Sequence, residues 1–169
     1  MDIREAHAGD IPGILAIYND AVANTTAIWN DALVDLENRR AWLRDKQLSG
    51  YPVLVAAAGD GAVLGYAAFD NWRAWDGYRH TVEHSVYVRQ DARGRGVGKA
   101  LIVQLIRRAE AMGKHVMVAG IDAQNEASIR LHKQLGFEEV GLLREVGTKF
   151  GGWLDLVFMQ LTLRGTKEV

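Results

Sequence analysis

The stretch from Glu83 to Leu101 constrains the fold of this chain more than any other. Residues 85–88 are β-branched and aromatic, which predicts a strand, and a glycine-rich segment then leads into an apolar helical stripe that begins at Val97. A glycine-rich bend between a strand and a helix leaves backbone N–H groups uncovered, with the helix dipole behind them. The stretch therefore predicts a binding site for a phosphate or pyrophosphate group.

Two common phosphate-binding motifs do not fit this bend. A Walker A loop requires G-x-x-x-x-G-K-[ST], but Gly98 and Lys99 are followed by Ala100, which lacks the hydroxyl that would hold magnesium. The dinucleotide motif G-x-G-x-x-G would need a glycine where the chain has Lys99 or Leu101. For this stretch taken alone, a glycine turn that merely bends the chain stays open as an alternative.

Length and composition limit the class of protein. A chain of 169 residues with 49% hydrophobic residues predicts one domain, residues 1–164, followed by a short tail, residues 165–169. The net charge of −1 gives no general attraction for nucleic acid, and no apolar run reaches the ~18 residues of a membrane helix. The absence of cysteine excludes disulfides, thiolate metal sites and a cysteine nucleophile. We expect a cytoplasmic protein that holds no metal and binds neither membrane nor nucleic acid.

The hydrophobic pattern predicts a mixed α/β domain. Strands are expected at residues 3–6, 51–58, 63–69, 81–88, 115–121, 138–146 and 154–163. Helices are expected at residues 10–22, 35–48, 97–112 and 127–135, with Asp10 and Asp35 as N-caps of the first two. The order predicts a central mixed sheet of about seven strands flanked by about four helices. A loop of aromatic and basic residues, 70–79, interrupts the pattern, and a second loop is expected at residues 147–153.

Residues 93–98 read R-x-x-G-x-G, which resembles the acyl-CoA-binding signature of the GCN5-related N-acetyltransferases (GNAT). A second resemblance to that family follows in order and spacing, at Asn125 and in the run Leu-His-Lys-Gln-Leu-Gly-Phe at residues 131–137. The resemblance implies the GNAT fold, acetyl-CoA as co-substrate, and a backbone N–H on the strand before the bend that polarises the thioester. The residues that it implies for acetyl-CoA binding are Val86, Tyr87, Val88, Arg93, Gly94, Arg95, Gly96, Val97, Gly98, Lys99, Asn125 and Gln134.

Four further stretches resemble the phosphinothricin acetyltransferase branch of this family and its bacterial methionine sulfoximine and methionine sulfone N-acetyltransferases. They are Ile17–Val22, Thr25–Trp29, Thr81–Val88 and Gly151–Asp155. The resemblance covers about residues 3–163. It implies direct, sequential acetylation of the α-amino group of small amino-acid analogues, among them L-methionine sulfoximine, L-methionine sulfone and phosphinothricin, by a homodimer.

Two residues are candidates for the proton transfers that amide formation needs. Glu83 sits near the start of the strand that leads to the bend, so it is our candidate base; a solvated carboxylate or a partner for an arginine is the alternative. His132 stands where the family often has a tyrosine acid, and could protonate the thiolate or merely touch CoA from a helix face. His84 alternates to the other face of the strand and is expected to be structural.

The aromatic loop supplies candidates for acceptor binding. Arg73 could clamp an α-carboxylate bidentately, or it could be a surface arginine stacked on Trp72. Ala74, Trp75, Trp29 and Glu83 complete the predicted acceptor set. A peptide or protein N-acetyltransferase and a non-catalytic acyl-CoA sensor are the competing functions.

Overall fold

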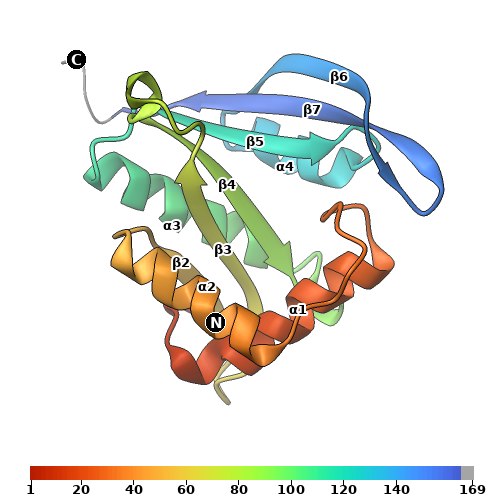
Figure 1. Cartoon of the computed structure of the whole chain (residues 1–169). Coiled ribbons are helices and arrows are strands. Elements are labelled where there is room, and N and C mark those ends of the chain that lie inside the picture. The colour runs from red at the N-terminus through yellow and green to blue at the C-terminus, as the bar shows by residue number, and fades with distance from the viewer. Residues whose placement is uncertain (165–169) are drawn as a thin grey trace. The chain divides into compact units, whose positions relative to one another are not determined.

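The computed structural model describes residues 1–164; the predicted tail, residues 165–169, lies outside the described residues. Its strands are β1 (Asp2–Glu5), β2 (Val53–Ala57), β3 (Val63–Asn71), β4 (Thr81–Val88), β5 (Val116–Asp122), β6 (Glu138–Lys149) and β7 (Gly152–Thr162). Its α-helices are α1 (Ile11–Asn24), α2 (Leu36–Leu48), α3 (Val97–Ala111) and α4 (Glu126–Gln134). Over these residues the strands belong to one sheet in the order β1-β2-β3-β4-β5-β7-β6, which confirms the predicted fold (Figure 1).

The main difference from the expected elements is at the β6–β7 connection. The loop expected at residues 147–153 is almost entirely strand, and Lys149 pairs with Gly152 across a two-residue turn. Phe150 and Gly151 both have positive φ, 51° and 75°. Positive φ at both central residues matches the twist of the flanking strands, so the chain reverses without a longer loop.

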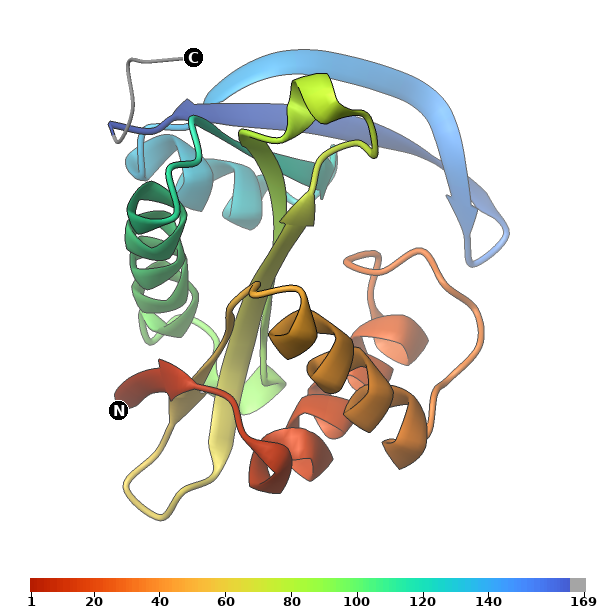
Figure 2. The ribbon, with the colours of Figure 1, turned by 60° about the vertical axis from the view of Figure 1, so that its left-hand side comes forward.

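The chain folds as two compact units, and residues 1–69 and 85–105 make the first. In this unit β1, β2 and β3 pair antiparallel, and α1 and α2 lie side by side (Figure 2). The helices pack their apolar faces on the strands because isoleucines at helical spacing meet a strand that is buried along its whole length. The core of this unit contains Ala6, Ile11, Ile14, Ile17, Leu43, Val53, Val55, Val63, Tyr66 and Ala68.

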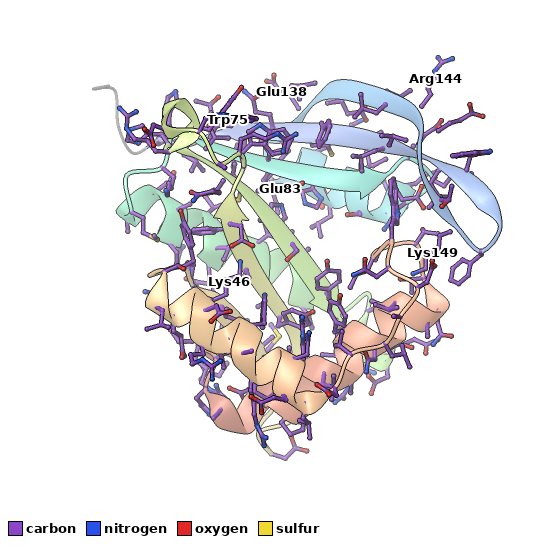
Figure 3. The ribbon with its side chains drawn as sticks, in the orientation of Figure 1. Lys46, Trp75, Glu83, Glu138, Arg144 and Lys149 are labelled. Carbon is purple, nitrogen blue, oxygen red and sulfur yellow. The ribbon has the colours of Figure 1, made fainter. Side chains whose placement is uncertain are left out.

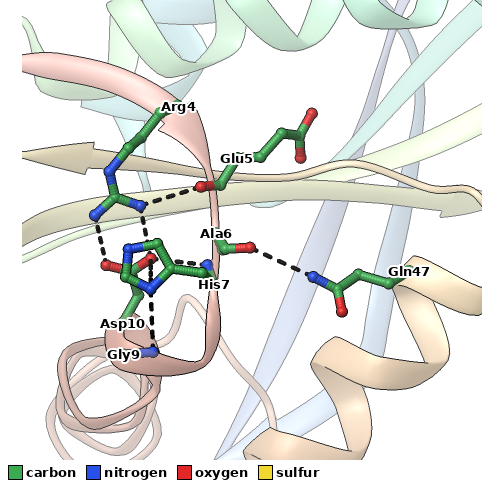
Figure 4. A network of polar contacts seen from close by, with 7 residues as sticks. All are labelled: Arg4, Glu5, Ala6, His7, Gly9, Asp10 and Gln47. Carbon is green, nitrogen blue, oxygen red and sulfur yellow. Dashed lines mark hydrogen bonds and ion pairs between the residues drawn. The ribbon is translucent and has the colours of Figure 1, made fainter.

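An ion pair fixes the start of the chain. Arg4 makes two hydrogen bonds to the buried carboxylate of Asp10, at 2.7 and 2.8 Å, and the same carboxylate accepts the backbone N–H of His7 at 2.9 Å (Figure 4). Asp10 does precede α1, but its side chain makes no capping bond to that helix. The predicted cap is therefore wrong in its bonding, because Arg4 and the short 3-10 helix Ala8–Asp10 use the carboxylate instead.

The second unit comprises Asp70–His84 and the described chain from Ile106 onward. Here the start of β4 pairs parallel with β5, β5 pairs antiparallel with β7, and β7 pairs antiparallel with β6. The β6 ladder is interrupted between Leu143 and Gly147, where Glu145 has a φ of 50° and donates its backbone N–H to Asp155 at 2.7 Å. This bulge leaves β6 as a twisted edge strand.

Candidate active site

The glycine-rich bend of the first unit has the geometry of an anion site. Gly94 and Gly96 have φ of 73° and 79°, and the space where a side chain would stand is open at both. The first helical bond of α3 runs from Ala100 N–H to the Gly96 carbonyl at 3.0 Å. The N–H groups of Val97, Gly98 and Lys99 therefore precede the helical bonding pattern and point out of the helix start, which suits a phosphate.

Basic side chains surround this bend. Arg93, Arg95 and Lys99 are all exposed. Arg93 is oriented by a bond from Nε to the Val88 carbonyl at 3.2 Å and by Asp20 at 3.8 Å. An exposed arginine held by the strand end can turn toward a bound phosphate at little cost. The basic side chains and the backbone N–H donors of this segment therefore both favour an anion.

The end of β4 leads directly into the bend. Val86, Tyr87 and Val88 are half-buried, and Arg89 N–H donates to the Leu64 carbonyl of β3 at 2.8 Å. Tyr87 packs its ring on Tyr66, with the ring centroids 5.3 Å apart. The segment that the sequence assigned to the thioester is thus firmly held against β3.

In the second unit, the carboxylate of Glu83 lies half-buried on the first half of β4 (Figure 3). Burial raises the pKa of the Glu83 carboxyl, Arg73 opposes this effect, and Asp70 adds to it. The carboxylate lies beside Gly120 of β5, where an added Cβ would stand 3.1 Å from Oε1, and Leu156 and Phe158 of β7 lie within 4 Å of the same point. We call the surface formed by Glu83, Gly120, Leu156 and Phe158 the Glu83 face. A carboxyl with a raised pKa is a better base near neutral pH than an ordinary glutamate.

The aromatic loop is anchored to this face. Trp72 packs edge-on against Phe158, with ring centroids 5.2 Å apart, and its backbone N–H donates to the Thr81 carbonyl at 3.1 Å. The guanidinium of Arg73 lies 3.9 Å from the centre of the Trp72 ring and donates to the Trp72 carbonyl at 2.8 Å. The stacking alternative for Arg73 is therefore present in the structure. It leaves the exposed guanidinium oriented by Trp72 rather than loose in solvent.

The other predicted acceptor residues do not gather in one unit. Ala74 and Trp75 follow Arg73 in the loop, and the Trp75 side chain is 71% exposed (Figure 3). Trp29 belongs to the first unit, where its ring N–H donates to the Thr26 carbonyl at 2.8 Å. The second unit by itself brings together Arg73 and Glu83.

His132 lies in the interior, 1% exposed. Its Nδ1 is 2.7 Å from the Ser128 carbonyl, so Nδ1 carries the proton and donates it there. Its Nε2 lies 3.1 Å from Nε2 of the buried His84, so His84 donates to His132. His132 at neutral pH thus has no spare proton, and burial lowers its pKa further. This geometry does not favour the proton-donor role for His132, and the structural role expected for His84 stays a prediction that its burial suits.

Asn125 and Gln134 stand at the two ends of α4. The Asn125 side chain accepts the Ser128 N–H at 3.1 Å, which is an N-cap bond. Its amide group retains donors that the cap does not use. Gln134 is exposed in the last turn. Their predicted contacts with acetyl-CoA remain predictions.

Sequence reasoning missed Gly120, Leu156 and Phe158. These residues meet Glu83 because β7, the last strand in the sequence, pairs with β5, and Gly120 is opposite Phe158 in that ladder. One signal was present: a glycine interrupts an otherwise apolar strand, which marks a close approach of another group. The pairing of His84 with His132 was missed for the same reason, since it joins residues 48 positions apart.

The glycine-rich helix start of the first unit suits the pyrophosphate of an acyl-CoA, and the second unit separately holds a half-buried carboxylate. Residues 14–137 match the acetyltransferase (GNAT) family. The chain belongs to that family.

Three relatives bring the comparison closer. The chain is 59% identical to the L-methionine sulfoximine/L-methionine sulfone acetyltransferase of Pseudomonas aeruginosa, over 98% of this chain and 96% of that protein. The structure matches that of a ribosomal-protein-alanine N-acetyltransferase from Brucella melitensis at 54% identity and a TM-score of 0.94, covering 96% of this chain and 100% of the other. It also matches a Sinorhizobium meliloti phosphinothricin acetyltransferase in complex with acetyl-CoA, at 38% identity and a TM-score of 0.94, over 99% and 92%.

Two kinds of feature are absent from residues 1–164. In that part of the chain, no group of three or more histidine, aspartate or glutamate side chains is placed to hold a metal ion. None of the helices described there combines the length and the apolar character that crossing a membrane would take.

Proposed function

We propose that this protein transfers the acetyl group of acetyl-CoA to the α-amino group of small amino-acid analogues. The acceptors are L-methionine sulfoximine and L-methionine sulfone, the substrates named for the Pseudomonas aeruginosa relative, and also phosphinothricin. The observation that carries the proposal is the half-buried Glu83 carboxylate, which shares the second unit with an oriented Arg73. Location in the cytoplasm, where acetyl-CoA is at hand, belongs to the same proposal.

The acetyl group passes directly from acetyl-CoA to the acceptor, by sequential transfer. The ammonium of the acceptor loses a proton to Glu83, directly or through a water molecule, and the free amine attacks the thioester carbonyl. The new N–C bond forms as the C–S bond breaks, and the nitrogen gives up its second proton to solvent as it becomes an amide. CoA leaves as a thiolate that takes a proton from solvent. We assign His132 no step, because both of its ring nitrogens are engaged.

Arg73 is the residue that we propose to select a free amino acid. A guanidinium presents a planar pair of donors that match a carboxylate, and stacking on Trp72 reduces the freedom that binding must remove. The N-terminal residue of a peptide has no free α-carboxylate to meet this cation. The competing acceptor is a protein N-terminus, because the chain is also similar to the ribosomal-protein-alanine N-acetyltransferase of Brucella melitensis.

The first experiment is thiol release from acetyl-CoA with four acceptors: L-methionine sulfoximine, L-methionine sulfone, phosphinothricin and a short peptide that begins with alanine. Turnover of the amino-acid analogues and not of the peptide is expected. Turnover of the peptide alone would refute the amino-acid analogues as acceptors and indicate a protein N-terminus instead. Binding of acetyl-CoA by calorimetry without turnover of any acceptor would indicate a non-catalytic sensor.

Two variants then test the residues. Glu83→Gln should lower kcat by about 100-fold or more, in the range of a lost general base, while Glu138→Gln, an exposed carboxylate on β6, should keep wild-type activity (Figure 3). Arg73→Ala should raise KM for the amino acid and leave binding of acetyl-CoA unchanged. Arg107→Ala, an exposed arginine on α3, is its control. Equal KM values in the two arginine variants would remove Arg73 from the proposal.

We also propose that the chain forms a homodimer through β6. Four apolar side chains of this edge strand are exposed: Val140 (55%), Leu142 (48%), Leu143 (43%) and Val146 (51%). An edge strand with exposed apolar residues is a liability unless another chain covers it. Light scattering should give twice the chain mass. Leu142→Glu should yield monomer, and Leu48→Glu, at a leucine that is 80% exposed at the end of α2, should not. A monomeric wild type would refute this.

A further inference from the structure

We propose that Gly120 is a positioning residue for the reaction: the missing side chain on β5 leaves the space in which the Glu83 carboxylate lies. The inference rests on the proposed role of Glu83 as the base. It adds a residue to which neither the sequence motifs nor a contact with substrate would point.

The geometry around Gly120 carries the inference. Glu83 is paired with Val118 in the parallel β4–β5 ladder, and its side chain reaches forward along the sheet toward Gly120. A methyl group on Gly120 would lie 3.1 Å from Oε1 of Glu83. It would lie 3.5 Å from Leu156 Cδ1 and 3.7 Å from Phe158 Cε1, which are ordinary contact distances. The carboxylate oxygen is thus the one neighbour that is too close.

The backbone does not explain the glycine. Seven glycines of the described chain have positive φ and need the freedom that glycine gives, but Gly120 is not among them. A glycine in the middle of a strand costs conformational entropy and contributes no packing. In this structure the Glu83 carboxylate lies over the β5 backbone at Gly120. A side chain at position 120 would displace that carboxylate.

The surroundings make the position of this carboxylate sensitive. The charged groups that act on it are Arg73 from the aromatic loop and Asp70 from the end of β3, while Gly120, Leu156 and Phe158 offer no hydrogen bond from a side chain. A base must lie within hydrogen-bond reach of the proton that it removes, and displacements well below 1 Å alter that reach. Because Oε1 is the end of a flexible side chain, the carboxylate would move and the strand would not.

The test is Gly120→Ala with Gly141→Ala as its matched control. Gly141 lies in β6, is paired with Phe158, lacks positive φ, and has no atom within 4 Å of the position that a methyl group would take. We expect Gly120→Ala to lower kcat about tenfold or more, with KM for acetyl-CoA unchanged and Tm equal to or above that of the wild type. The acid limb of the kcat/KM profile should move to higher pH, since the methyl group removes water from the carboxylate. Gly141→Ala should match the wild type in all four.

A double variant separates a positioning role from a general loss of packing. Glu83→Asp shortens the side chain by one methylene and so draws the carboxylate back from position 120. The space that this frees can hold the methyl group of Gly120→Ala. The activity of Gly120→Ala combined with Glu83→Asp should therefore exceed the product of the two single effects. A lost packing contact would give effects that multiply.

The outcomes are distinct from those that test the proposed function. If Glu83→Gln is inactive while Gly120→Ala keeps the wild-type kcat and pH profile, the positioning role is overturned and the proposed function stands. If Glu83→Gln is fully active, the role of Glu83 as the base fails and the role of Gly120 fails with it, while turnover of the acceptors still supports the acetyltransferase activity. A Gly120→Ala protein that does not fold would also overturn the inference, which requires the strand to tolerate the methyl group.

Discussion

Lowering the pH from 7 to 5 should destabilise this protein through the buried pair formed by His84 and His132. The rings stack with centroids 5.1 Å apart and share one proton between the two Nε2 atoms, 3.1 Å from each other. Phe137 packs against both rings, and Nδ1 of His84 is buried without a hydrogen-bond partner. Any added proton would therefore place a charge in an apolar environment next to another imidazole.

The magnitude follows from proton linkage. Burial, together with the neighbouring His132, lowers the pKa of His84 from 6.5 to about 3. Because the folded pKa lies below the unfolded one, the unfolded chain binds more protons. The stabilisation is then complete above pH 6.5 and is lost as the pH falls toward the folded value. Between pH 7 and pH 5 the loss from His84 is about 2 kcal/mol in the free energy of unfolding. The pKa of His132 is also lowered, so that residue adds to the loss in the same direction.

Neither Glu83 nor Asp10 can cause this loss. Glu83 acts in the opposite direction, because its raised pKa gains stability as the pH falls. Asp10 has a lowered pKa, since its bonds to Arg4 and His7 outweigh the effect of burial, and its contribution is lost only below this window. A variant that removes His84 alone isolates the contribution of His84 to the pH dependence of stability.

The assay is urea unfolding followed by circular dichroism at pH 7 and pH 5, at one protein concentration. His84→Gln keeps an N–H donor for His132 but cannot titrate, so its loss of stability between the two pH values should be about 2 kcal/mol smaller than that of the wild type. His115→Gln, at an exposed histidine, is the matched control. Equal losses in the wild type and His84→Gln would refute the reasoning.

Three further predictions concern stability and are measured by the same unfolding assay. Leu105→Ala, at a fully buried position of α3, should cost about 2–5 kcal/mol, and a cost below 1 kcal/mol would contradict the packing described. Asp10→Asn should cost about 1–3 kcal/mol because it leaves Arg4 without its carboxylate; Asp60→Asn, in an exposed turn, is the control. Asn125→Ala should cost about 1 kcal/mol through the lost cap of α4, and Asn125→Ser should recover most of it.

Local signals in the sequence predicted the helices, the strands and most of their ends well. The glycines of residues 94–96, the cap at Asp35 and the positive φ at Gly113 and Gly136 all depend on a few neighbouring residues, and each is as expected. The boundary at residues 147–153 was wrong because Phe150 takes positive φ in a tight turn. A non-glycine residue gives no sign of that conformation in the sequence.

The environments of Glu83 and His132 could not be predicted from such local signals. Whether Glu83 faces solvent or an apolar surface depends on which strand lies beside β5, and that strand comes from the end of the chain. His132 was placed on a helix correctly, but its burial depends on His84 across the unit. Sequence patterns identify the element that carries a group, whereas its pKa and its reach depend on partners distant in the chain.

The closure of the aromatic loop has a consequence for how new specificities arise. The bond from Trp72 N–H to the Thr81 carbonyl closes the loop, and the pairing of Thr81 with Val116 fixes the strand register from the next step onward. The His80 carbonyl also accepts the backbone N–H groups of His115 and Val116, so residues 73–79 can be lengthened, shortened or exchanged without moving Glu83. An insertion after Thr81 would instead turn His84 outward and bury the glutamate. Recombination and directed evolution should accept length changes on one side of Thr81 and reject them on the other.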